Sequence, residues 1–154
     1  MSIEYNFYLN APLGPAQFFA ELGRAMDLKI QIEFTTKWAL LTSDLAAVDA
    51  AVRPITSFRK EFLLEDFDFS ATLSLCLRLH KATIEEQVQS QQTVINILKA
   101  LCLHFDWDLL LLRDSEKWSF RRVQQQAEYN PDEALWGMPE RLVQVQALLQ
   151  KIRA

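Results

Sequence analysis

The stretch FDFSATLSLCLRLHK, residues 67–81, decides the fold class because its polar and apolar residues alternate. Leucine occupies every second position from Leu73 to Leu79, so the leucines lie on one face of a strand. The other face carries the polar and sulfur-containing side chains Ser70, Thr72, Ser74, Cys76, Arg78 and His80. This pattern predicts a sheet with one face on a core and the other face open to solvent.

The sequence before this stretch predicts a strand–helix–strand–strand unit over residues 3–43. Alternating residues at 3–10 indicate the first strand, and a proline opens a helix over 15–26. Two further alternating runs, at 28–35 and 38–43, indicate a hairpin.

The same order of elements returns in residues 67–123. We expect a strand over 69–79 and then a long helix that begins after Thr83, with a glutamate three residues later as in a capping box. Strands at 107–113 and 117–123 would form a second hairpin.

Two segments lie outside these units. Residues 44–66 are interpreted as a connection with one or two short helical pieces, and residues 131–153 as C-terminal helices, the last of them amphipathic. The sequence thus predicts a single α+β domain over residues 1–154. Its sheet would have about six largely antiparallel strands, with helices on one face and a C-terminal amphipathic helix.

Composition limits the classes of partner. Half of the residues are hydrophobic and 23% are charged, which excludes a disordered chain. A net charge of −4 argues against direct nucleic-acid binding and favours a protein partner with a basic contact surface. No run of apolar residues reaches the length of a signal peptide or membrane span, so we expect a cytoplasmic protein with no membrane partner.

Candidate catalytic and metal-ligating residues are few. Cys76, His80, Cys102 and His104 could in principle bind zinc, but Cys102 is expected on a helix at the opposite side of the sheet from Cys76. Cys76 and His80 would stand roughly 13 Å apart along one strand, too far for a nucleophile–base pair. We therefore expect no metal, no cofactor and no enzymatic activity. An enzyme with an unrecognised site around Arg78 and His80 stays an alternative.

Acidic residues gather at the expected loops and strand ends, where they either form a solvated rim or contact a basic partner. Trp136, beside Gly137-Met138-Pro139, either locks the tail to the body or anchors an interface. The candidate partner-binding residues are Glu61, Glu65, Asp66, Asp68, Asp106, Asp108, Asp114, Glu116 and Trp136.

Several short segments of the second half of the chain carry a family resemblance. They are Phe67-Asp68-Phe69, Thr72-Leu73-Ser74-Leu75, Arg78-Leu79-His80-Lys81, the helix around Val94 to Leu98, Asp108 to Leu112, and Trp136 to Leu142. Together, over about residues 67–142, they resemble the SitI-type immunity proteins. The resemblance implies a non-enzymatic cytoplasmic antidote that acts in bacterial competition. Such a protein binds a cognate antibacterial toxin and blocks its active site or its substrate access.

A second class stays open beside it. In size, acidity, alternation of α and β elements and amphipathic C-terminal helix, the chain is also similar to type III secretion chaperones. Such a chaperone would dimerise and hold a segment of an effector in extended form.

Overall fold

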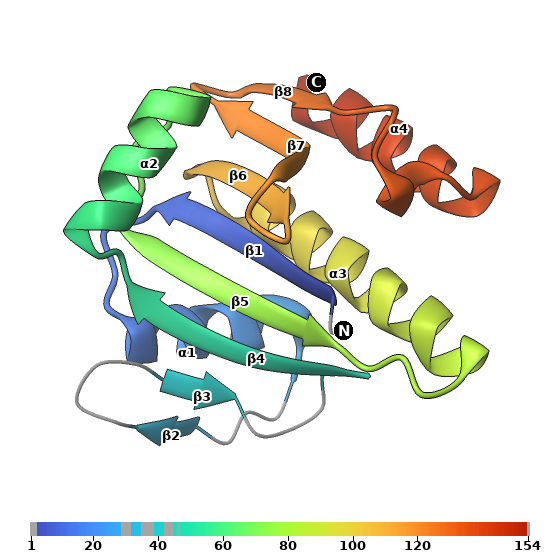
Figure 1. The fold of residues 1–154 in the computed structure, drawn as a ribbon, viewed down its shortest axis with the longest axis horizontal. Coiled ribbons are helices and arrows are strands. Elements are labelled where there is room, and N and C mark those ends of the chain that lie inside the picture. The colour runs from blue at the N-terminus through green and yellow to red at the C-terminus, as the bar shows by residue number, and fades with distance from the viewer. Residues whose placement is uncertain (1–2, 29–31, 35–38, 42–44, 46, 154) are drawn as a thin grey trace.

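A single antiparallel sheet organises the protein. The computed structural model describes residues 3–28, 32–34, 39–41, 45 and 47–153. Within them, eight strands pair in the order β2-β3-β4-β5-β1-β6-β7-β8 (Figure 1). Every neighbouring pair is antiparallel. The strands are β1 (Ile3–Asn10), β2 (Ile32–Phe34), β3 (Ala39–Leu41), β4 (Val48–Pro54), β5 (Leu73–Leu79), β6 (Asp108–Arg113), β7 (Lys117–Val123) and β8 (Gln126–Tyr129).

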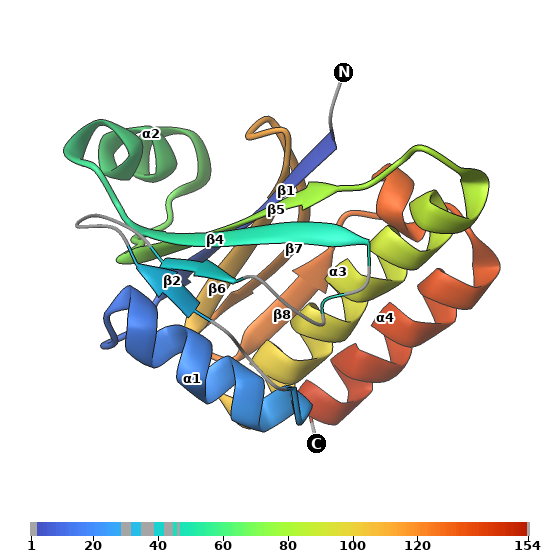
Figure 2. The same ribbon diagram turned by 90° about the horizontal axis from the view of Figure 1, so that it is seen from below.

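Helices cover the two faces of this sheet unequally. They are α1 (Pro15–Met26), α2 (Ser57–Phe67), α3 (Ile84–His104), the short 3-10 helix η1 (Ala134–Trp136) and α4 (Pro139–Arg153). Figure 2 shows α1, α3 and α4 on one side of the sheet and α2 on the other. The α2 helix lies over one end of its face, so the rest of that face stays open.

The alternation of β5 is confirmed. Its four leucines are at most 5% exposed and belong to the main core, which lies between the sheet and α1, α3 and α4. On the other face Ser74 and Cys76 are half-buried and Arg78 is exposed. The smaller second core lies on that face, where Leu63 of α2 packs with Tyr8 and Leu110.

The two expected units interlock. β1 pairs with β5 on one side and with β6 on the other, and both of these strands belong to the second unit. Neither unit could therefore bury its hydrophobic face alone, and the main core runs continuously through both.

Several local predictions are confirmed by the structure. The α1 helix begins at Pro15 and ends at Met26, and Thr83 caps α3 because its Oγ1 accepts a hydrogen bond from the Glu86 N–H at 3.0 Å. The α+β class, the antiparallel sheet and the C-terminal helix are also confirmed.

Other expectations need correction. The sheet contains two strands more than about six, because β4 lies inside the expected connection 44–66 and β8 follows the second hairpin. The α2 helix is an exception to the expectation of helices on one face. The tail starts with the three-residue η1 in place of a longer helix from residue 131. Parts of the first hairpin, at 29–31, 35–38 and 42–44, lie outside the described residues.

Candidate functional site

The α2 helix is held firmly above the open face of the sheet. Thr56 caps its first turn by accepting a hydrogen bond from the Arg59 N–H at 3.2 Å. At its other end Asp68 adopts a left-handed conformation with φ 50°, and its N–H returns to the last carbonyls of the helix. Arg121 of β7 then donates to the carbonyl oxygens of Phe67 at 2.6 Å and Asp68 at 3.3 Å. These contacts fix which side of α2 meets the sheet.

The inner side of α2 forms the second core. Leu63 is fully buried there, and the rings of Phe62 and Phe67 meet edge to face at 5.9 Å between centroids. Both rings pack against the buried cluster that includes Tyr8 and Leu110 of the sheet. This apolar side accounts for the attachment of the helix.

The outer side of α2 also carries apolar side chains, and acidic side chains lie among them. Phe58 is 78% exposed and Leu64 46% exposed, and Glu61 and Glu65 are exposed on the same side of the helix. Spacings of three and four residues place these side chains on one side of the helix. We call Phe58, Glu61, Leu64 and Glu65 the outer stripe. It is apolar surface that folding does not use, and such surface marks candidate interaction sites.

The carboxylates expected to bind a partner fall into separate groups. Glu61, Glu65, Asp66 and Asp68 come together on α2 and its C-cap, and the last three line a hollow of about 440 Å³ beside Trp118. This part of the predicted site is thus one continuous element of the molecule.

The four other predicted carboxylates lie at the two ends of β6. Asp108 accepts a hydrogen bond from the Gln124 N–H at 2.9 Å, and Asp106 precedes it at the same end. At the opposite end Asp114 accepts from the Glu4 N–H at 3.0 Å, with Glu116 in the same turn. The sheet holds these groups a strand length apart, so the nine predicted residues do not form one patch.

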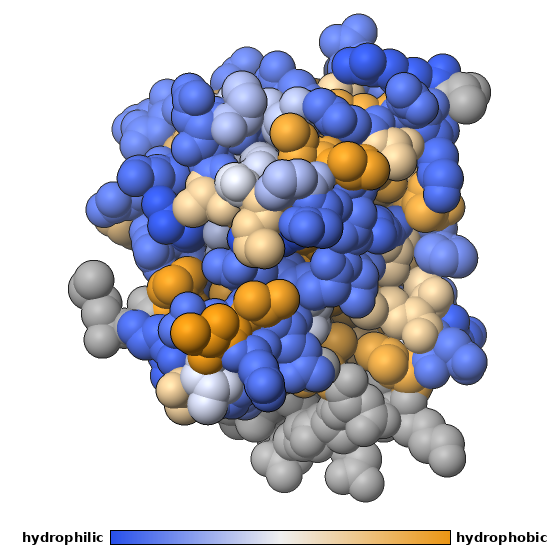
Figure 3. Space-filling model, turned by 90° about the vertical axis from the view of Figure 1, so that its right-hand side faces the viewer, coloured by the Kyte–Doolittle hydropathy of each residue, from blue (hydrophilic) through white to orange (hydrophobic). Residues whose placement is uncertain are grey.

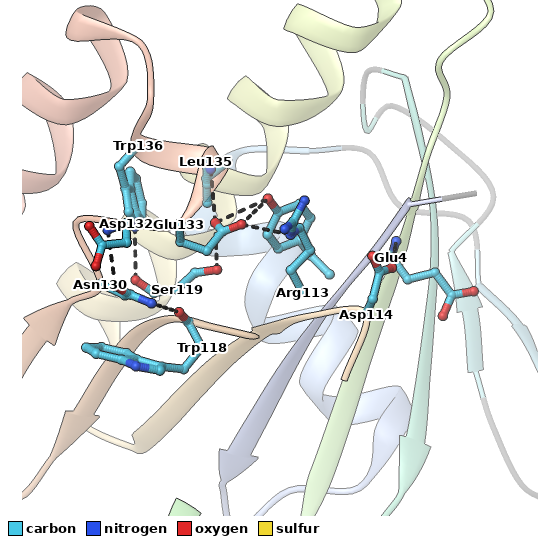
Figure 4. Close-up of polar contacts among 11 residues, drawn as sticks. Glu4, Arg113, Asp114, Trp118, Ser119, Asn130, Asp132, Glu133, Leu135 and Trp136 are labelled. Atoms are coloured by element: carbon cyan, nitrogen blue, oxygen red, sulfur yellow. Dashed lines mark hydrogen bonds and ion pairs between the residues drawn. The ribbon is translucent and has the colours of Figure 1, made fainter. Parts of the chain in front are cut away.

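Trp136 is a correction. It is 3% exposed, its Nε1–H donates to the Ser119 carbonyl oxygen at 2.9 Å, and its ring meets Tyr129 edge to face (Figure 4). A ring buried in the main core offers no surface to a partner. Of the two roles considered for Trp136, the structure shows that it locks the tail to the body.

Cys76 and His80, on the open face, have separate neighbours. Cys76 lies 3.9 Å from a carboxylate oxygen of Glu4, whereas His80 meets Asp49 at 3.1 Å. Burial, followed by the nearby charge of Glu4, raises the pKa of Cys76 to about 11. Burial raises the pKa of Cys102 to about 12. Both thiols are therefore protonated at neutral pH, which makes them poor nucleophiles and poor metal ligands.

Exposed apolar side chains elsewhere are smaller. On the face viewed in Figure 3 they form small groups divided by polar residues. Ile84 and Val88, 79% and 48% exposed, open α3, and Val143 lies on α4. None of these three is aromatic, so Phe58 is the large exposed ring among the described residues.

Sequence reasoning found the acidic residues of α2 but missed Phe58 and Leu64. The sequence could have indicated this second apolar side, because a helix over residues 57–67 has apolar residues on two opposite sides. Which side faces solvent depends on the sheet, which lies far away in sequence.

Comparison with known proteins identified no relative of this chain. No protein-family model matches the chain, and neither a curated protein nor a solved structure matches it. Among the described helices, none combines the length and the apolar character needed to cross a membrane.

Proposed function

We propose that the protein is an immunity protein that binds a cognate antibacterial toxin and blocks its active site or substrate access. The observation that carries this proposal is the outer stripe of α2, where Phe58 is 78% exposed and Glu61 and Glu65 lie on the same side of the helix. The sequence resemblance to SitI-type immunity proteins supports an antibacterial toxin as the partner.

The outer stripe has the composition of a binding hot spot. An aromatic side chain that enters a pocket on the partner removes a large apolar area from water, and a few such residues carry most of the affinity of an interface. Folding has already ordered α2 through its caps and its inner side, so binding would cost little further backbone entropy. The outer stripe is therefore preorganised for binding.

The charge of the stripe indicates the partner. Glu61 and Glu65 lie three and seven residues after Phe58, on a chain whose net charge is −4. Such a surface accelerates encounters with a basic surface, and salt weakens the effect. We infer that the contact surface of the toxin is basic, and that the complex requires neither nucleic acid nor a membrane.

The test is co-expression with the toxin domain encoded beside the gene of this protein, followed by calorimetry of the purified pair. We expect growth rescue and an equimolar complex. Phe58→Ala should weaken binding by about 30-fold or more, the loss typical of a hot-spot aromatic residue. Glu61→Lys should slow association, with a smaller difference at high salt.

The chain offers matched controls on α3. Ile84 is 79% exposed, so Ile84→Ala removes an apolar side chain of similar exposure, and Glu85→Lys makes the same charge change outside the stripe. Both should leave affinity within about twofold. A Phe58→Ala variant that binds as tightly as Ile84→Ala would contradict the role of the stripe. An obligate dimer in light scattering that holds an extended effector segment would favour a type III secretion chaperone instead.

A further inference from the structure

The β8 strand forms one edge of the sheet. It is the last strand in the order of pairing, and among the described residues no further strand follows on its outer side (Figure 1). Its inner side pairs with β7 in a tight hairpin, whose two turn residues Gln124 and Gln125 both have positive φ. An edge strand carries main-chain N–H and C=O groups that its own sheet leaves unpaired.

The strand register identifies which of these groups point outward. The Asn130 N–H donates to a carbonyl oxygen of β7 at 3.0 Å, so the main chain of Asn130 faces β7. The direction of the main-chain groups alternates along a strand, so Gln126 and Glu128 also face β7. Ala127 and Tyr129 face away from it. Their outward N–H and C=O groups have no hydrogen-bond partner in the described part of the chain.

Ala127 has little contact with bulk water. The whole residue is 9% exposed, and its side chain belongs to the main core. Its outward main-chain groups share only that small area. Folded proteins pair or cover such groups almost without exception, so this edge is incomplete by itself.

A hollow of about 640 Å³ reaches around this edge, and its walls include Glu128, Ala127 and Arg153 of α4. Glu128 lies on the α2 face of the sheet, because it is opposite Arg121, which donates to the Phe67 carbonyl oxygen of α2. Ala127 belongs to the core on the other face. A hollow that touches both faces passes around the free edge, so the space beside the unpaired groups is open to an incoming chain.

The geometry and charge of the edge define what fits there. Two outward residues, two positions apart, match alternate residues of another extended chain. Glu128 lies between them, with no ion pair among the described residues, and it shares a second hollow with Asp66 and Asp68. A strand that pairs with this edge is therefore stabilised by a basic side chain on the α2 face.

A second copy of the chain fits this edge poorly. Antiparallel pairing of Ala127 with Tyr129 of another β8 would place Glu128 directly opposite its own counterpart. Like charges directly opposite each other destabilise a pair of strands.

We propose that the outer edge of β8 binds an extended segment of a protein partner, which adds a strand to the sheet and places a basic side chain beside Glu128. The main chain of that segment completes the hydrogen bonds of Ala127 and Tyr129. The inference rests on the sheet edge and not on the outer stripe, so it does not require the partner to be a toxin.

The test uses the heptapeptide KWSFRRV with blocked ends as the probe. It copies β7, which pairs with β8 in the fold, and it carries three positive charges. The full chain is titrated with this peptide, and amide hydrogen exchange is measured by NMR. We expect saturable binding that slows exchange at Ala127 and Tyr129 about tenfold or more. Exchange at Gln126 and Glu128, which already face β7, should change much less.

Variants make the result specific. Ala127→Pro removes one outward N–H while keeping the bonds to β7, and it should weaken peptide binding about tenfold. Glu128→Lys should weaken it about threefold at low salt and less at high salt. Glu85→Lys makes the same charge change on α3 and should have no effect. Urea midpoints verify that each variant folds.

A peptide of the same sequence with methylated backbone nitrogens keeps the charges but cannot pair as a strand, so it should not slow exchange. Equal binding of the methylated peptide, or unchanged exchange at Ala127 and Tyr129 under saturation, would overturn the proposal. A dimer of the free chain with both amides already protected would assign the edge to a second copy and overturn it as well. Each of these results leaves the calorimetry of the outer stripe with the toxin unaffected.

Discussion

Two polar clusters of the protein differ in whether the chain itself satisfies their hydrogen-bonding groups. Around Glu133, whose side chain is 0% exposed, the chain supplies close partners: Arg113 Nε at 2.9 Å, the Ser119 hydroxyl at 2.8 Å and the Leu135 N–H at 3.0 Å (Figure 4). Around Asn6, on the other face, the described residues supply none. The first cluster is satisfied by the chain itself, whereas the Asn6 amide is left to solvent, because Arg141 Nε is the one buried side-chain atom without a partner among the described residues.

The Glu133 cluster explains how the tail is attached. Its carboxylate joins η1 to β6 through Arg113 and to β7 through Ser119, so α4 leaves the sheet at a fixed point. Gln144 of α4 then exchanges hydrogen bonds with Gln92 of α3 at 2.8 and 3.0 Å. The Arg141 Nε is one imperfection, a buried atom without a hydrogen-bond partner among the described residues. Burial lowers the pKa of Arg141.

The largest effect is expected where the complete cluster is broken. Glu133→Gln keeps the shape of the side chain but removes its charge, which leaves Arg113 without its partner and the Leu135 N–H with a weaker acceptor. We expect a loss of about 2–4 kcal/mol in the free energy of unfolding, measured by urea denaturation. The exposed Glu116→Gln should stay within about 0.5 kcal/mol. Equal effects of the two substitutions would show that Glu133 does not hold the tail.

Tyr5 tests the same cluster by pH. Its hydroxyl lies 3.4 and 3.5 Å from the two Glu133 carboxylate oxygens, and burial, followed by the charge of Glu133, raises its pKa above the usual 10.0. Between these two pKa values the unfolded chain releases the phenol proton and the folded chain keeps it, so stability falls as the pH rises above about 10. Below that pH the contribution is fully present.

Tyr5→Phe should reduce this alkaline loss while costing about 1 kcal/mol at pH 7, because the hydrogen bonds are long. The free energies of unfolding at pH 8 and pH 10.5 measure both effects. The thiols of Cys76 and Cys102, with pKa values raised to about 11 and 12, leave part of the loss in place because they act with the same sign. If the free energy of unfolding of Tyr5→Phe fell between pH 8 and pH 10.5 as steeply as that of the unmodified protein, Tyr5 would not contribute to the alkaline loss.

Local sequence signals predicted the parts of the fold that depend on near neighbours. Pro15 and Thr83 place the starts of α1 and α3, and the leucines of 73–79 identify the buried face of β5. The β4 strand was missed because its alanines favour a helix, and it becomes a strand by pairing with the free edge of β5. The β8 strand follows Gln124 and Gln125, both at positive φ, where a glycine or asparagine would have indicated the turn.

The candidate site shows the same limit. Glu61, Glu65, Asp66 and Asp68 are close in sequence, so their grouping could be predicted and the α2 helix preserves it. The exposure of Phe58 follows from which side of α2 faces the sheet, and the sheet residues beneath it come from β1 and β6. The position of Asn6 between β5 and β6 is likewise a long-range register that alternation alone does not fix.

The smallest effect on stability is expected at Asn6, and it separates the two clusters most sharply. Asn6→Leu replaces an amide without a partner by an apolar group of similar size, so the free energy of unfolding should change by about 0 to 1 kcal/mol, towards higher stability. Asn130→Leu is the matched control, because Asn130 donates to the Trp118 carbonyl oxygen at 3.0 Å and accepts from the Asp132 N–H at 3.1 Å. That substitution should cost about 1–3 kcal/mol in the same urea experiment. If Asn6→Leu destabilised the protein as much as Asn130→Leu, the Asn6 amide would have a hydrogen-bond partner within the folded chain, and the two clusters would no longer differ in kind.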